Sequence, residues 1–158
     1  MTNITLEDIV LPGTVSIFAA LQLTRIAKKV GVMRGKFKIA FPATTGEPTF
    51  ERAFRAQQNT LEFMPIFMPC LWVSGIFFHP VPSALAGVVY LYSRHRYFEG
   101  YIKSVEDRLP GFKLGVRCLM VMLFMSSCGL STTLLRRYAD IDIAQTFWQI
   151  VEKYLPSK

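Results

Sequence analysis

A long stretch of this chain contains no charged residue, and a polar, charged segment comes directly before it. From Phe63 to Ser93 there is no Asp, Glu, Lys or Arg. A helix needs about 20 mostly apolar residues to cross a bilayer, and this stretch exceeds one such helix. The charged residues before it, between Phe50 and Glu62, are costly at a membrane boundary unless they have partners. The chain is therefore constrained to a membrane fold, and these residues suggest a polar ligand held at the boundary.

Four apolar segments predict an all-α integral membrane protein, a four-helix bundle formed by one domain over residues 1–158. The chain is 51% hydrophobic. Pro80 and Pro82 interrupt the uncharged stretch, and prolines at such positions end one helix and begin the next. The expected helices cover residues 9–27, 50–78, 82–109 and 114–135, and a short interfacial segment is expected at 143–154.

The basic residues predict the orientation in the membrane. Fourteen of the eighteen Lys and Arg residues lie within residues 25–55 or 94–117. Cytosolic loops carry an excess of positive charge, so we expect the first and third connections, and any site beside them, to face the cytosol. Arg136 and Arg137 run against this pattern. The basic cluster follows the first apolar span rather than preceding it, which favours a retained helix over a secretory signal.

The net charge of +7 is compatible with nucleic acid, anionic lipid or an acidic small molecule as partner. Nucleic acid is the least supported of these, because the arginines border apolar runs and no recognition motif is present. Cys70, Cys118 and Cys128 lie inside apolar runs without zinc-type spacing. We therefore expect no nucleic-acid partner and no metal site.

Polar side chains form a stripe on the second expected helix, near its cytosolic end. Arg55, Asn59 and Glu62 are spaced i, i+4 and i+7, so they share one helix face. An arginine suits a carboxylate, through paired hydrogen bonds. A glutamate suits an ammonium group, and an asparagine suits an amide. The alternative is an ordinary surface pair between Glu51 and Arg55 at i, i+4.

A second polar stripe is expected on the third helix, which we predict to continue until Pro110 stops it. Arg94, Tyr97, Tyr101 and Arg108 would then share one face, at the same depth as the first stripe. The alternative for the tyrosines is an interfacial aromatic belt. Together the two stripes suit a small zwitterionic peptide with two carboxylates, one amine and amide links. Glutathione fits that description.

Three blocks of the sequence resemble the family of membrane-associated proteins in eicosanoid and glutathione metabolism (MAPEG). They are the segments 44–59, 71–78 and 96–101. The resemblance implies a four-helix protomer in a homotrimer of the endoplasmic reticulum or nuclear envelope, with glutathione between neighbouring subunits. The family's glutathione contacts fall on Arg34, Arg55, Gln57, Asn59, Glu62, Tyr97 and Tyr101, and its thiol-activating arginine falls on Arg108.

The activity that the resemblance implies is conjugation of the glutathione thiolate to lipophilic electrophiles such as the leukotriene A epoxide, with peroxidase activity on lipid hydroperoxides. The alternative is a non-catalytic lipid-binding member similar to 5-lipoxygenase-activating protein, but that relative lacks counterparts of Arg55 and Arg108. Gly35 and Phe63 stand where the leukotriene-C synthase branch of the family has arginine and tyrosine. These two departures favour a broader range of electrophiles.

Overall fold

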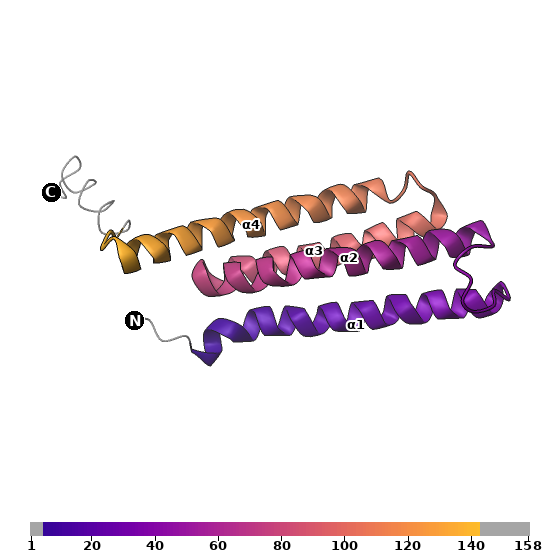
Figure 1. Ribbon diagram of the computed structural model, residues 1–158, viewed down its shortest axis with the longest axis horizontal. Helices are drawn as coiled ribbons and strands as arrows, with labels where there is room; N and C mark the ends of the chain where they lie inside the picture. The colour runs from indigo at the N-terminus through magenta and orange to yellow at the C-terminus, as the bar shows by residue number, and fades with distance from the viewer. Residues whose placement is uncertain (1–4, 143–158) are drawn as a thin grey trace.

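The computed structural model describes residues 5–142, and within that range it contains four α-helices and no strand. The helices α1 (Leu6–Lys36), α2 (Pro48–Phe77), α3 (Pro80–Lys103) and α4 (Leu109–Tyr138) lie side by side in one elongated bundle (Figure 1). The prediction of an all-α four-helix chain is confirmed. The expected interfacial segment at 143–154 lies outside the described residues.

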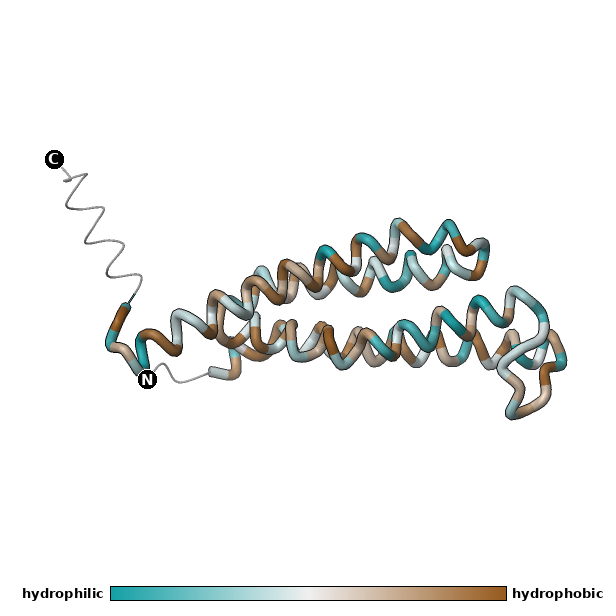
Figure 2. The backbone as a smooth tube through the Cα atoms, turned by 45° about the horizontal axis from the view of Figure 1, so that its top comes forward, coloured by the Kyte–Doolittle hydropathy of each residue, from teal (hydrophilic) through white to brown (hydrophobic). Residues whose placement is uncertain are grey.

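Three of these helices are long and apolar enough to cross a membrane. They are α1 from Ile9, α2 and α4. α3 is not among them, because its second half carries several charged residues, although its 24 residues extend about 36 Å against a hydrocarbon core of about 30 Å. Figure 2 shows hydrophilic segments along the half of the bundle nearest the connection between α1 and α2. Passage of α3 through the bilayer stays a prediction.

The break after α2 occurs where Pro80 and Pro82 predict it, and α2 itself begins at a proline, Pro48. The Glu47 carboxylate caps α2 by accepting hydrogen bonds from the backbone N–H groups of Thr49 (2.7 Å) and Phe50 (3.1 Å). Between α2 and α3, His79 Nδ1 accepts from the N–H of Val81 at 3.2 Å, with Pro80 opening α3. These caps satisfy N–H groups that have no partner inside the helix.

α1 is longer than the predicted 9–27 because the basic cluster after Arg25 continues the helix to Lys36. The cluster was predicted to lie in the connection after the first helix, but it is helical, because long cationic side chains can extend from a helix into the membrane interface. α4 is likewise longer than the predicted 114–135 at both ends. In each case the helix extends past its apolar part.

The predicted end of α3 at residue 109 is wrong. α3 ends at Lys103, and Pro110 lies in the first turn of α4 instead of stopping α3. The reversal is tight because the backbone of Asp107 packs directly on Gly100, where an added Cβ would overlap the Asp107 carbonyl oxygen. Gly111 similarly admits the α4 backbone against the backbone of Tyr97. This turn places Arg108 next to α3 without the residue being part of it.

Two clusters of buried apolar side chains hold the bundle together. The cluster in the membrane half includes Phe67 stacked on Tyr90, with ring centroids 4.2 Å apart. The cluster near the connecting loops joins α1, α2 and α3 through Ile26, Val30, Phe50, Ala53, Ala56, Tyr97 and Phe98. The second cluster supports the polar stripes described next.

Candidate functional site

A pocket of about 190 Å³ lies between α2, α3 and the turn that leads into α4. Its lining residues are Arg55, Gln58, Asn59, Glu62, Tyr97, Tyr101 and Arg108. Six of the eight residues predicted to bind glutathione or activate its thiol therefore meet at one place. Gln58 was not predicted, although its position one helical turn after Arg55 puts it on the same face.

The α2 side of the pocket presents unpaired charges. Within residues 5–142, neither Arg55 nor Glu62 makes a hydrogen bond or an ion pair, and both side chains are exposed. The alternative pair with Arg55 is not formed, because the Glu51 carboxylate accepts a hydrogen bond from the N–H of Gly46 at 2.7 Å. One cation and one anion are thus free to meet a ligand.

The opposite wall consists of two aromatic rings and a guanidinium. The rings of Tyr97 and Tyr101 meet edge to face, with centroids 5.7 Å apart. The Arg108 guanidinium carbon lies 4.8 Å from the centre of the Tyr101 ring, and its Nε donates to the Val105 carbonyl at 2.9 Å. The cation–π contact and the hydrogen bond hold this arginine at the pocket although it belongs to the turn.

Arg94, a member of the predicted stripe on α3 that was not among the predicted glutathione contacts, is buried next to the pocket. Its side chain is 1% exposed, and its Nη2 donates to Asn59 Oδ1 at 2.9 Å and to Thr60 Oγ1 at 3.0 Å. Its guanidinium carbon lies 4.4 Å from the Tyr97 ring centre and 5.2 Å from that of Phe63. The clue in the sequence was its position: an arginine that directly ends an uncharged stretch needs partners inside the protein.

Arg34 and Gln57, the other two predicted residues, do not line this pocket. Arg34 lies at the end of α1, where its Nη1 donates to the Ala43 carbonyl at 2.7 Å. Its guanidinium carbon lies 4.5 Å from the ring centre of Phe41 and 4.8 Å from that of Phe50. A smaller hollow of about 130 Å³ adjoins the pocket and shares Arg55 and Gln58 with it.

The charges around the pocket favour an anionic or zwitterionic ligand. Arg55 and Arg108 line it and Arg94 lies below it, whereas Glu62 is the one acidic residue of its lining. The Arg94 charge has no carboxylate within 4.0 Å among the residues that the structure describes. A buried cation without an acidic partner raises the positive potential of the site above it.

Comparison with known proteins gives matches over most of the chain. The sequence model of the MAPEG family matches residues 12–128. Microsomal glutathione S-transferase 2 of Homo sapiens is 42% identical over 136 residues, which are 86% of this chain and 92% of that protein. Leukotriene C4 synthase of Rattus norvegicus is 40% identical over 124 residues, which are 78% of this chain and 83% of that protein. The matched region contains the whole pocket.

Proposed function

Because the chain belongs to the MAPEG family, we propose that it is a glutathione-dependent membrane enzyme that conjugates glutathione to lipophilic electrophiles such as the leukotriene A epoxide. The observation that carries the proposal is the convergence of Arg55, Glu62 and Arg108 on one pocket. Two relatives of this chain are a microsomal glutathione S-transferase and a leukotriene C4 synthase. The family of the chain therefore supports the same class of reaction that the charges of the pocket suit.

Each polar group of glutathione has a complementary side chain in the pocket. Arg55 is suited to a carboxylate, because its planar guanidinium can donate two parallel hydrogen bonds. Glu62 is suited to the ammonium group. Asn59 is suited to a peptide carbonyl through its side-chain N–H₂, since its oxygen already accepts from Arg94. The hydroxyl groups of Tyr97 and Tyr101 add donors at the edge.

The proposed chemical role of Arg108 is to stabilise the thiolate. A free thiol has a pKa of about 8.5 and is mostly protonated at neutral pH. A guanidinium near the sulfur favours the thiolate, which is the nucleophile. The sulfur attacks an epoxide carbon, the carbon–oxygen bond breaks, and the alkoxide takes a proton from water. With a lipid hydroperoxide, attack on the terminal oxygen gives an alcohol and a sulfenic acid, which a second glutathione converts to a disulfide and water.

The size of the pocket supports a site completed by a second copy. Ligand pockets usually enclose about 300–1,000 Å³, whereas this pocket encloses about 190 Å³ and opens at the protein surface. Arg34 and Gln57 do not reach it from the same chain. Our proposal therefore includes a homotrimer in which a neighbouring subunit supplies these two side chains. The basic residues at this end of the bundle favour a cytosolic opening, in the endoplasmic reticulum membrane or nuclear envelope.

The decisive experiment measures thiolate formation and conjugation separately. The purified full-length protein in detergent receives glutathione, and the ultraviolet absorbance of the thiolate is recorded before any electrophile is added. Leukotriene A, an aryl halide and a lipid hydroperoxide are then tested as second substrates. Thiolate absorbance with product formation supports the enzyme, and Arg117→Ala, at an exposed arginine of α4, serves as control. Binding of lipid without either signal would instead indicate a non-catalytic member of the family.

A further inference from the structure

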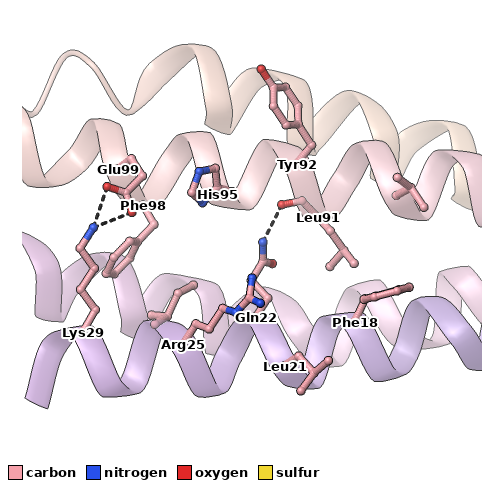
Figure 3. A pocket seen from close by; sticks show the side chains of 12 residues that line it. Phe18, Leu21, Gln22, Arg25, Lys29, Leu91, Tyr92, His95, Phe98 and Glu99 are labelled. Carbon is pink, nitrogen blue, oxygen red and sulfur yellow. Dashed lines mark hydrogen bonds and ion pairs between the residues drawn. The ribbon is translucent and has the colours of Figure 1, made fainter.

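A groove of about 600 Å³ lies between α1 and α3, and it shares no lining residue with the glutathione pocket. Figure 3 shows side chains from both helices pointing into it. The amide of Gln22 bridges the two helices by donating to the Leu91 carbonyl at 2.8 Å. The proposed transferase chemistry makes no use of this groove.

The groove changes from apolar to polar along its length. One half is lined by Phe18 and Leu21 of α1 and by Val88 of α3, which are 56%, 50% and 52% exposed. The other half is lined by Arg25 and Lys29 of α1 and by His95 and Glu99 of α3. Both helices run toward the end of the bundle that holds the connection between α1 and α2, so the polar half lies nearer that end (Figures 1 and 3). The basic residues of that end predict a location at the membrane boundary, and the apolar half would then lie deeper in the bilayer.

Among the residues that the structure describes, the polar half carries one unpaired positive charge. Lys29 Nζ donates to both carboxylate oxygens of Glu99 at 2.7 Å, so these two charges neutralise each other. Arg25 is exposed and makes no hydrogen bond or ion pair with any residue in the described part of the chain. A membrane groove with an apolar half and an unpaired arginine at the boundary is complementary to an anionic amphiphile.

The length of the groove and its change in polarity suit a lipid. Phe18 and Lys29 are separated by about 16 Å along α1, at 1.5 Å per residue. A groove of about 600 Å³ over that length can hold part of an acyl chain against its apolar half, with the headgroup at its polar half.

We propose that this groove binds one anionic phospholipid of the surrounding bilayer. An acyl chain lies along Phe18, Leu21 and Val88, and the phosphate lies at Arg25. The exposed apolar rim leaves the lipid's other chain in the bilayer, so the lipid enters laterally. Basic pockets between membrane helices at the cytosolic side are suited to anionic headgroups.

The test compares two phospholipids with identical dioleoyl chains. Delipidated full-length protein in detergent is titrated with phosphatidylglycerol and with phosphatidylcholine, and bound lipid is counted by native mass spectrometry. One arginine near an anionic lipid is expected to give about a five-fold preference for phosphatidylglycerol. Arg25→Gln should abolish this preference, because it removes the charge and keeps the shape of the groove. Arg117→Gln, at an exposed arginine of α4, should retain it.

A second variant tests the apolar half. Leu21→Trp places a bulkier side chain in the groove and should lower the binding of both lipids, while the circular dichroism of the protein stays unchanged. Equal affinity of the wild type for both lipids overturns the proposal, as does an equal loss of preference in Arg25→Gln and Arg117→Gln. Binding of sodium oleate at this groove with no phospholipid bound also overturns it. A change of oligomeric mass in Leu21→Trp would assign the groove to a second copy and overturn it equally.

Discussion

The buried guanidinium of Arg94 donates a hydrogen bond to Asn59 Oδ1 over 2.9 Å, and this contact fixes which end of the asparagine amide faces the pocket. The oxygen is occupied by Arg94, so the N–H₂ group is the part of Asn59 left for a ligand. We therefore expect Arg94 to act as a positioning residue for the pocket, through its contacts with Asn59 and the Tyr97 ring.

Asn59→Asp separates this orienting contact from ligand binding. The carboxylate still accepts from Arg94 and adds an ion pair with it, so the fold should be retained or stabilised. The variant lacks the N–H₂ donor, and hydrogen bonds to charged groups contribute about 1.5–3 kcal/mol. We expect glutathione affinity, measured by calorimetry, to fall by at least about 10-fold, and the melting temperature not to fall. A lower melting temperature together with unchanged affinity would contradict the orienting role.

Arg55→Ala and Glu62→Ala test the two unpaired charges of α2. Each should weaken glutathione binding by about 1.5–3 kcal/mol, the range for hydrogen bonds to charged groups. Neither residue has a partner within the part of the chain that the structure describes, so the folded state should lose little stability. Glu51→Ala is the matched control on the same helix. If calorimetry gives wild-type affinity for both variants, the pocket is not the glutathione site.

The sequence predicted the parts of this site that depend on helical spacing and missed those that depend on packing. The face shared by Arg55, Asn59 and Glu62 follows from a period of 3.6 residues. The position of Arg108 does not follow from that period, because it depends on the contact between Gly100 and Asp107 in the turn. The helix ends were misjudged for a related reason, since apolar length marks the membrane part of a helix and not the whole helix.

The position of Arg94 at the end of an uncharged stretch indicates that it needs polar partners, but it does not identify them. A long cationic side chain in that position can also find water at the membrane interface. Its partners Asn59 and Thr60 are far from it in the chain and meet it because α2 and α3 pack together. The sequence shows that an arginine is present at this position, and only the packing of α2 against α3 shows that its side chain is buried.

Gly35 provides a test of substrate breadth. An added Cβ at this position meets no atom within 4 Å, so Gly35→Arg should fold normally. We expect the wild type to conjugate several lipophilic electrophiles and to reduce lipid hydroperoxides. The Gly35→Arg variant should shift kcat/KM toward the leukotriene epoxide relative to an aryl halide, and Gly35→Gln should not. A wild type that accepts the leukotriene epoxide alone would contradict this expectation.

The orientation in the membrane can be tested with single cysteines at two exposed helix ends, Lys36 and Lys103. Both belong to the basic segments that predict a cytosolic location. In a background without the native cysteines, a membrane-impermeant thiol reagent added to sealed microsomes should label both positions. Labelling that requires permeabilised membranes would place the pocket that we propose for glutathione on the opposite side.

Arg108→Ala tests the catalytic role. The guanidinium is held over the Tyr101 ring and lines the pocket, where its charge should lower the pKa of the bound glutathione thiol. Loss of the charge should reduce kcat more than it raises KM, as expected when a transition-state interaction is removed. The kcat of Arg108→Lys should lie between those of the wild type and Arg108→Ala, because lysine keeps the positive charge and lacks the planar guanidinium. Arg117→Ala is the control for a general loss of positive charge.

The pH dependence of these variants gives the sharpest result. In the wild type, the thiolate should form at a pH below the ordinary thiol pKa of about 8.5. The rate should therefore reach its plateau at a lower pH than in Arg108→Ala. In Arg108→Ala the apparent pKa should rise toward that value, and raising the pH should partly restore the rate, because solvent hydroxide then removes the proton. The measurement is a pair of pH–rate profiles at saturating glutathione. If both enzymes have the same apparent pKa and the same plateau, Arg108 stabilises the turn and does not activate the thiol.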